Sequence, residues 1–213
     1  RLHSKMSADE VRKTTVELMK KVRIPAPESR LKSYPGQFSG GMRQRIMIAM
    51  AIACNPELLI ADEPTTALDV TIQAQILALI KQIKTDSQMS CILITHDLGV
   101  VAGFAERVLV MYAGQPIEQA ETRELFKNPR HPYTKGLLAS LPKIDEAVAR
   151  LHTIKGSVPS PKNMPKGCRF HTRCPYANSV CIDAEPQMRE AAPGHICKCH
   201  FAEKITEDAA KWN

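Results

Sequence analysis

The chain has 213 residues, of which 44% are hydrophobic and 24% charged, and its formal net charge is +7. This composition fits a globular protein with one good core and an appendage, and it excludes a membrane span and a signal peptide, so we expect a soluble chain. The positive charge predicts either an acidic partner (nucleotide, nucleic acid or anionic membrane face) or simply a solvated basic surface.

The first predicted helix follows a capping box at Ser7-x-x-Glu10. Its packed face is formed by residues at helical spacing, namely Val11, Thr15, Leu18 and Val22. We expect this helix to end before Pro25, and we expect residues 30–37 to form a loop.

The next predicted helix covers residues 42–54 and begins at Ser39-Gly40-Gly41. Free backbone N–H groups and the helix dipole at such a start attract an anion. Residues 46–53 are apolar on every side, which predicts a helix buried in the interior. Arg43 and Arg45 lie unfavourably in the first turn. Their charge fits either a polyphosphate at the helix tip or nearby carboxylates.

Two short apolar runs, residues 58–61 and 91–94, are predicted to form buried parallel strands. Asp62 and Glu63 follow the first strand, and His96 lies just beyond the second. Open α/β sheets bind ligands at the carboxyl ends of their strands, so these residues are candidates for a site. The alternatives are a helix N-cap for the acidic pair and simple packing for the histidine. Between the strands, Asp69 begins a helix with one apolar face, made of Ile72, Ile76, Leu79, Ile80 and Ile83.

A third strand is predicted over residues 107–112, and a three-residue loop, Ala113-Gly114-Gln115, returns it into residues 116–118 as a hairpin. Residues 121–127 form a short helix that ends at Asn128-Pro129. Alternating strands and helices predict an α/β fold. From Arg130 onward prolines recur and the apolar periodicity fades, which indicates a separate, irregular C-terminal extension over residues 130–213.

The extension is rich in cysteine. Its spacing is C-x5-C-x6-C-x17-C, formed by Cys168, Cys174, Cys181 and Cys199, and Cys197 lies close to the last of them. From spacing alone, an iron–sulfur cluster, a zinc site and unligated thiols all remain open. A chain with so little packing usually needs a staple, and these cysteines could provide one.

Four motifs in this sequence resemble those of a single protein family. Ser39-Gly40-Gly41-Met42 followed by RQR resembles the signature motif of an ATP-binding cassette (ABC) ATPase, residues 58–64 its Walker B motif, residues 65–69 its D-loop and residues 95–97 its switch histidine. The usual signature is LSGGQ, so Met42 replaces the glutamine. The stretch YPGQFSGGMRQR from Tyr34 is most similar to ATPase subunits of dipeptide and oligopeptide importers.

The resemblance implies the C-terminal part of a P-loop NTPase cassette over residues 1–129, with a helical subdomain remnant to about residue 54 and a core over residues 55–129. No G-x-x-x-x-G-K-S/T motif occurs, so the Walker A loop is missing, and so is the Q-loop. We therefore interpret the sequence as the C-terminal portion of a longer ATPase. We do not expect it to bind and hydrolyse ATP alone.

The resemblance also assigns roles to single residues. Asp62 would hold Mg²⁺ through water, Glu63 would polarise the attacking water, and His96 would contact the γ-phosphate and Glu63. Asp69 would work across a dimer interface. The signature residues would cover the ATP that is bound to a partner cassette, and these are Ser39, Gly40, Gly41 and Met42.

The implied function is ATP hydrolysis that powers peptide import. The implied cofactors are ATP and Mg²⁺. The implied partners are a second ATPase subunit, identical or related, the transmembrane permease subunits and, indirectly, an external peptide-binding protein, with no nucleic acid. The implied location is peripheral, on the cytoplasmic face of the membrane. One alternative is an ABC-type ATPase of DNA repair or chromosome maintenance, a class that interrupts the cassette with long coiled coils or zinc modules, and no sustained heptads appear in this sequence. The other alternative is a non-catalytic metal-binding module.

Three short segments of the C-terminal extension also resemble a known protein family. HPYT from His131, GCRF from Gly167 and RCP from Arg173 are similar to the C-terminal extension of peptide-importer ATPases, where a four-cysteine [4Fe–4S] site is known. This implies Cys168, Cys174, Cys181 and Cys199 as ligands, with Cys197 as the alternative fourth. If the metal were Zn²⁺, His171, His195 and His200 could be ligands. The cluster would serve as a structural staple or as a redox sensor.

Overall fold

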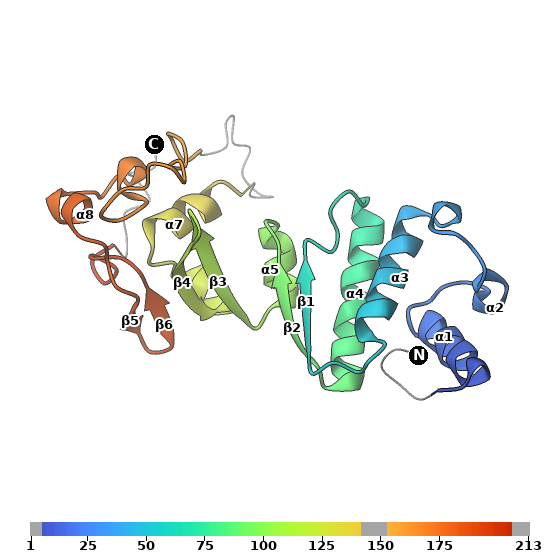
Figure 1. The fold of residues 1–213 in the computed structure, drawn as a ribbon. Helices are drawn as coiled ribbons and strands as arrows, with labels where there is room; N and C mark the ends of the chain where they lie inside the picture. The colour runs from blue at the N-terminus through green and yellow to red at the C-terminus, as the bar shows by residue number, and fades with distance from the viewer. Residues whose placement is uncertain (1–5, 142–152, 206–213) are drawn as a thin grey trace. The chain divides into compact units, whose positions relative to one another are not determined.

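The computed structural model describes residues 6–141 and 153–205 (Figure 1). The chain forms two compact units, Arg1–Val100 and Val101–Asn213. Within the described residues, no helix is long and apolar enough to cross a bilayer.

The first unit begins with α1 (Ala8–Lys21), and the predicted capping box is confirmed, because the side chains of Ser7 and Glu10 each accept the other's backbone N–H. The segment predicted as a loop is more ordered than expected. It follows a one-turn helix, α2 (Pro27–Arg30), and ends in a 3₁₀ turn, η1 (Pro35–Gln37). Both turns start with proline, whose fixed φ suits a first helical position. Elements this short leave no periodic signal in a sequence.

Helix α3 (Gly40–Ile52) begins at the glycines as predicted, with Ser39 as its N-cap. The prediction that it is buried on all sides was wrong. Ile48, Ala49 and Ile52 are buried, whereas Met47 is 61% exposed and Met50 72% exposed. The helix packs against α1 and against α4 (Val70–Ser87), and these neighbours leave the methionine face uncovered.

Strands β1 (Leu58–Asp62) and β2 (Ser90–Ile94) form the predicted parallel pair, in the register Leu58↔Ser90 to Asp62↔Ile94. One face of β1 is buried, whereas the corresponding residues of β2 are only half-buried, which corrects the expectation of fully buried strands. Leu59 and Ala61 point inward, whereas Ile60 is 60% exposed and Ile92 49% exposed, since no element within the described residues covers that face. Helix α4 begins at Asp69 as predicted, and its buried side chains are Ile76, Leu79, Ile80 and Ile83.

The second unit contains the predicted hairpin, β3 (Arg107–Tyr112) and β4 (Gln115–Glu121). Its loop has two residues instead of three, because Tyr112 pairs with Gln115. Ala113 and Gly114 both have positive φ, +47° and +77°, as the tight turns of two-residue hairpins require. The short helix predicted after the hairpin is α6 (Thr122–Lys127). Helix α5 (Leu98–Phe104) precedes β3 in the chain.

The extension adds to this hairpin. Its elements are α7 (Pro132–Ala139), η2 (His171–Arg173), α8 (Ser179–Asp183), β5 (Arg189–Ala192) and β6 (His195–Cys197). Strand β6 pairs antiparallel with β4, which gives a four-stranded sheet in the order β3-β4-β6-β5. Phe170 is 1% exposed and packs edge-on against Tyr112, with ring centroids 5.1 Å apart. The hairpin and the extension therefore share one core, whereas composition placed a boundary between them at residue 129.

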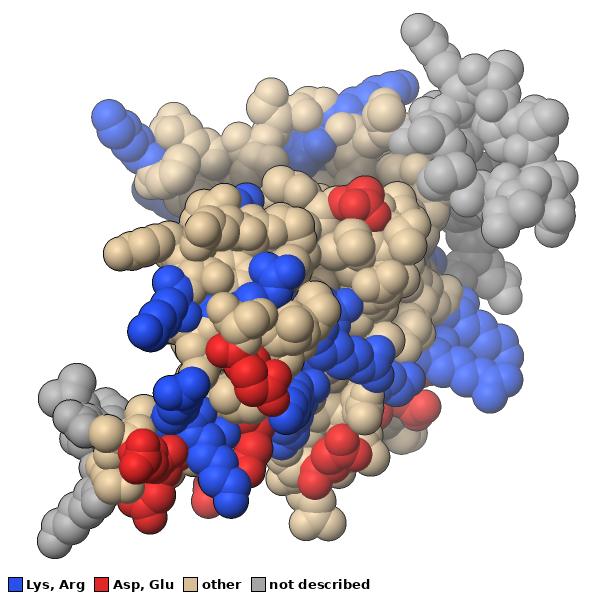
Figure 2. Space-filling view, turned by 90° about the vertical axis from the view of Figure 1, so that its right-hand side faces the viewer, with Lys and Arg blue, Asp and Glu red and all other residues tan. Residues whose placement is uncertain are grey.

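One face of the molecule carries charged side chains of both signs. Figure 2 shows Lys and Arg side chains interspersed with Asp and Glu side chains, beside a broad area of uncharged residues. The positive charge on this face is therefore distributed and does not form one basic patch.

Candidate functional site

The first candidate site lies where the parallel strands end. Asp62 is the last residue of β1 and pairs with Ile94, the last residue of β2. Glu63 continues this register, because its backbone N–H donates to the carbonyl oxygen of Ile94 over 2.9 Å. Asp62 thus ends one strand, Glu63 follows it directly, and His96 lies two residues beyond the end of the other strand.

Glu63 and His96 are in direct contact. Glu63 Oε1 lies 2.7 Å from His96 Nδ1, and Glu63 Oε2 accepts the hydroxyl hydrogen of Thr66 over 3.0 Å. The hydrogen bond from His96 holds the pKa of Glu63 below its usual value, and the same bond raises the pKa of His96. Glu63 has a φ of +46°, an uncommon backbone conformation for a glutamate. The carboxylate is therefore ionised and oriented, and the imidazole beside it remains exposed.

Asp97 anchors the loop that carries His96, and sequence reasoning missed this role. Asp97 Oδ1 accepts the backbone N–H groups of Gly99 (2.9 Å) and Val100 (3.2 Å) at the start of α5. Asp97 Oδ2 accepts a hydrogen bond from Gln73 Nε2 of α4 over 3.1 Å. The sequence Asp-x-Gly was a usable signal, since aspartate often caps its own backbone two residues on.

The signature residues occupy the start of α3. Ser39 Oγ accepts the backbone N–H of Met42 over 3.3 Å, so this hydroxyl already has a local partner. At Gly41 an added Cβ would lie only 2.8 Å from Ile72 Cγ2 of α4, whereas at Gly40 it would lie 3.6 Å from Leu68. Gly41 is therefore required for close packing of α3 on α4, independently of any ligand. Asp69 likewise has a local role, because its side chain accepts the N–H of Ile72 over 2.9 Å as the N-cap of α4.

The two arginines contact neutral oxygens and not the nearby carboxylates that one sequence interpretation offered. Arg43 Nη1 donates to the carbonyl oxygen of Phe38, and Arg45 Nη1 donates to that of Val22. Arg45 Nη2 also donates to Gln75 Oε1 over 3.1 Å. The guanidinium groups are thus paired with neutral oxygens, which offset the unfavourable dipole position without a carboxylate.

The second candidate site is a pocket in the second unit. It is lined by all four cysteines of the predicted ligand set, together with His131, Pro132, Phe170, Tyr176, Pro186, His200, Phe201 and Ile205. Burial raises the pKa of Cys174 to about 12 and that of Cys199 to about 11, so both are neutral thiols in the free protein. The fifth cysteine, Cys197, is fully buried in β6 and does not line this pocket.

The four thiols of the predicted ligand set line one largely apolar cavity. In the described part of the chain, however, no group of three or more Cys, His, Asp or Glu side chains is placed so that it could hold a metal ion. All three histidines considered for zinc have other partners. His171 Nδ1 lies 2.8 Å from the carbonyl oxygen of Cys168, and His200 Nε2 lies 3.0 Å from that of Ala184. His195 contacts Glu118 and does not line the pocket.

His195 instead forms a buried pair with Glu118. Both side chains are fully buried, and His195 Nε2 lies 2.7 Å from Glu118 Oε1. Glu118 Oε2 also accepts the backbone N–H of His131 over 3.1 Å. Burial raises the pKa of Glu118, but its hydrogen bonds, the one from His195 above all, outweigh burial and leave that pKa below the usual value. This pair fastens β6 of the extension to β4 of the hairpin.

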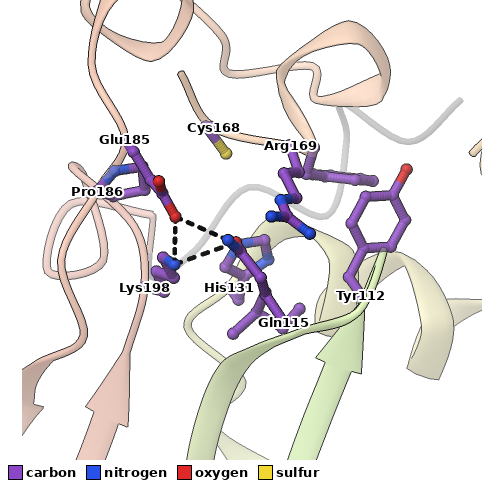
Figure 3. Close-up of a pocket in the computed structure, with 10 residues that line it drawn as sticks. Tyr112, Gln115, His131, Cys168, Arg169, Glu185, Pro186 and Lys198 are labelled. Atoms are coloured by element: carbon purple, nitrogen blue, oxygen red, sulfur yellow. Dashed lines mark hydrogen bonds and ion pairs between the residues drawn. The ribbon is translucent and has the colours of Figure 1, made fainter. Parts of the chain in front are cut away.

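A second group of polar contacts, among Gln115, Glu185 and Lys198, lines a pocket that Cys168 also lines. Lys198 Nζ donates to Glu185 Oε1 (2.6 Å) and to Gln115 Oε1 (3.0 Å), and Gln115 Nε2 donates to the same Glu185 oxygen over 2.8 Å. Figure 3 shows these three side chains linked at the pocket that Cys168 also lines. The triad connects the segment after α8 to the turn of the hairpin.

Comparison with known proteins finds two matching family models and several similar relatives. The ABC transporter family matches residues 2–66, and the family described as oligopeptide/dipeptide transporter, C-terminal region, matches residues 117–181. The oligopeptide transport ATP-binding protein AppD of Bacillus subtilis is 52% identical over 95% of this chain and 62% of its own length. The dipeptide transport ATP-binding protein DppD of Haemophilus influenzae is 55% identical over 87% of this chain and 56% of its own length. The chain is therefore similar to ATP-binding proteins of oligopeptide and dipeptide transport.

A third relative, the oligopeptide transport ATP-binding protein OppD of Salmonella typhimurium, is 49% identical over 93% of the chain and 59% of its own length. The chain thus spans about six tenths of the length of the curated relatives that it matches. The ABC transporter match covers the signature residues and the strand that ends at Asp62 and Glu63, and the second match covers three of the four pocket cysteines.

Proposed function

We propose that this chain provides the signature motif and the hydrolytic side chains of an ATP-binding subunit that powers peptide import. The observation that carries the proposal is the contact between Glu63 and His96 at the ends of two parallel strands, 2.7 Å long. The relatives named above are transport proteins for oligopeptides and dipeptides, which supports peptides as the cargo.

The chemistry follows from the two carboxylates and the imidazole. Glu63 is ionised and held by His96 and Thr66, so it can orient a water molecule and accept its proton during attack on the γ-phosphate of ATP. Asp62 is an exposed carboxylate at the strand end, and such an oxygen ligand suits Mg²⁺. Mg²⁺ would neutralise charge that develops on the phosphates. His96 would donate a hydrogen bond to the γ-phosphate.

The signature residues act on a different nucleotide in this proposal. Ser39, Gly40, Gly41 and Met42 would cover ATP bound to a partner cassette, and Asp69 would act at the same dimer interface. ATP would hold the two cassettes together and its hydrolysis would release them, which moves the permease subunits. The subunit would work at the cytoplasmic face of the membrane through these permeases, together with a peptide-binding protein outside.

The test replaces Glu63 by glutamine in the complete ATP-binding subunit, assembled with its permease. ATP turnover should fall about 10²- to 10⁴-fold because positioned general-base help is lost, while ATP binding persists. Glu57→Gln is the matched control, because Glu57 is an exposed glutamate just before the same strand. Unchanged turnover in Glu63→Gln would defeat the proposal.

For the pocket in the second unit, we propose a [4Fe–4S] cluster held by Cys168, Cys174, Cys181 and Cys199. Support comes from the shared pocket and from the match to the peptide-transporter C-terminal region. When bound, the cluster would staple the extension and could exchange an electron. Protein purified without oxygen should be brown and contain iron and acid-labile sulfide in equal amounts. A colourless protein that contains zinc would contradict the cluster.

A further inference from the structure

The side chain of His96 reaches Glu63 from an exposed loop. It is 84% exposed, so packing contributes little to its position, and a contact between such accessible side chains stabilises its own geometry only weakly. Glu63 is placed by the register of the two strands, because its N–H donates to the carbonyl oxygen of Ile94. The 2.7 Å contact therefore depends on how the backbone that carries His96 is held.

Asp97 holds this backbone on both sides of the histidine. The N–H of Asp97 donates to Thr95 Oγ1 over 3.1 Å, which closes a turn around His96. Asp97 Oδ1 accepts the N–H groups of Gly99 and Val100 at the start of α5. This second turn is tight, because a Cβ added at Gly99 would lie 3.2 Å from the same oxygen. The position of the Asp97 carboxylate is therefore linked to the path of the backbone at His96.

The second oxygen of this carboxylate is bound by a different element. Asp97 Oδ2 accepts a hydrogen bond from Gln73 Nε2 over 3.1 Å, in a partly buried position. Gln73 lies in the first turn of α4, and its own N–H donates to the carbonyl oxygen of Asp69 over 2.8 Å. Asp69 also caps this turn through its side chain, so the amide of Gln73 projects from a fixed backbone. A side chain on a helix positions a site more precisely than one on a loop.

We infer that Gln73 is a positioning residue for the hydrolysis proposed above, and that it acts through Asp97 to keep His96 in contact with Glu63. This inference rests on that proposed function and adds to it a side chain that lies outside the four sequence motifs. Because the Asp97 carboxylate only accepts hydrogen bonds, the Gln73 amide must supply the donor. A side chain of the same shape that cannot donate should therefore release the loop.

The test is Gln73→Glu in the complete ATP-binding subunit, assembled with its permease. Glutamate keeps the shape of the side chain but places two acceptors face to face. Turnover at saturating ATP should fall about 10-fold, since displacing a catalytic group by about 1 Å can cost up to about 10²-fold, while the Kd for ATP stays unchanged. Gln75→Glu is the matched control on the same helix. Gln75 accepts a hydrogen bond from Arg45, which a glutamate can also accept, so turnover should persist.

An exchange of donor and acceptor separates positioning from a general loss of structure. When Gln73→Glu is combined with Asp97→Asn, the new asparagine amide can donate to the new glutamate. The carbonyl oxygen of that asparagine can still accept the N–H groups of Gly99 and Val100. The double variant should therefore recover most of the turnover that Gln73→Glu loses. Far-ultraviolet circular dichroism of each variant shows whether it has folded.

The outcomes distinguish this inference from the proposed function. If Glu63→Gln retains wild-type turnover, the proposed function is refuted and the role of Gln73 with it. If Glu63→Gln loses turnover but Gln73→Glu retains it, only the role of Gln73 is overturned. The same conclusion follows if Gln73→Glu folds and loses turnover but the exchange recovers none of it, because the hydrogen bond to Asp97 is then not what the substitution removed.

Discussion

At the scale of single residues, the Glu63 carboxylate is held by two neighbours, His96 and Thr66, and its backbone adopts a left-handed conformation. A glutamate with positive φ is uncommon, and such outliers persist where surrounding contacts fix them. The backbone hydrogen bond from Glu63 to Ile94 is one such contact. The result is a carboxylate that is directed toward the histidine on the neighbouring strand's loop.

This contact predicts the titration of His96. The pKa of His96 should lie above the ordinary 6.5, because Glu63 stabilises the protonated ring, and Glu63→Gln should bring it back toward that value. The pair stabilises the folded state at pH values between the pKa of Glu63 and the pKa of His96. This stabilisation is lost when the pH falls through the lowered pKa of Glu63, and it is lost when the pH rises through the raised pKa of His96. Histidine NMR titration measures this, with His96→Gln for assignment and Glu57→Gln as control. The same pKa in wild type and Glu63→Gln would contradict the contact.

His131 predicts loss of stability in acid. Burial lowers its pKa to about 4, so the unfolded chain binds a proton more readily than the folded chain between about pH 6.5 and 4. Stability should therefore fall as the pH drops through this range, by about 3 kcal/mol from this group alone. His131→Asn keeps an oxygen to cap α7 but cannot titrate. Urea unfolding from pH 7 to pH 4 should show a shallower loss in the variant, and parallel curves would refute the assignment.

At the scale of elements, the approach of α3 to α4 determines what the first turn of α3 can contain. An added methyl group at Gly41 would lie 2.8 Å from the γ2 methyl carbon of Ile72, and a β-branched side chain cannot turn away easily. The same glycine therefore has two reasons to be there, helix packing and the proposed approach to a partner's nucleotide. A loss of function in a Gly41 variant would not by itself distinguish them.

A pair of substitutions separates the packing effect. Gly41→Ala should destabilise the chain by about 1–3 kcal/mol through overpacking, in spite of the better helix propensity of alanine. Gly40→Ala, whose new methyl group has an ordinary 3.6 Å contact, should not. In the Ile72→Ala background, Gly41→Ala should cost much less, and this coupling is measured by a double-mutant cycle of urea unfolding. Additive effects of the two substitutions would show that the contact is unimportant.

The elements that the sequence predicted well are those with local signals. The capping box of α1, the glycine start of α3 and the apolar stripe of α4 are all readable within a few residues, and all three are confirmed. The pairing of β6 with β4 joins residues nearly eighty positions apart, and β6 has only three residues. No local sequence pattern therefore predicts this pairing. The exposed face of α3 was missed because apolar composition does not tell which side a neighbour covers.

At the scale of the whole molecule, the two candidate sites belong to different compact units. Every residue proposed to act on nucleotide lies within Arg1–Val100, and every cysteine of the pocket lies within Val101–Asn213. The motifs of the first site could be recognised from sequence because they are contiguous. The contacts of Asp97 with Gln73 and of Glu118 with His195 could not, since each joins residues that are far apart in the sequence.

This division predicts a local effect of loading the thiol pocket. A group bound only by the folded state stabilises that state, so hydrogen exchange should slow in residues 165–205 when iron and sulfide are bound. Exchange in α3 and α4 should be unchanged, and these helices serve as the internal control. Cys174→Ala treated in the same way should show no slowing. Equal slowing throughout the chain would contradict a pocket that is confined to the second unit.

The uncovered side of β1 and β2 has a practical consequence for anyone who purifies this chain. Each strand has a single hydrogen-bonded neighbour within the described residues, and the pair displays Ile60 and Ile92 to solvent. Unpaired strand edges beside apolar side chains recruit further strands from other molecules. Concentrated stocks should therefore form thioflavin-positive aggregates after a lag that shortens with concentration, and a lysine in place of Ile60 should lengthen that lag.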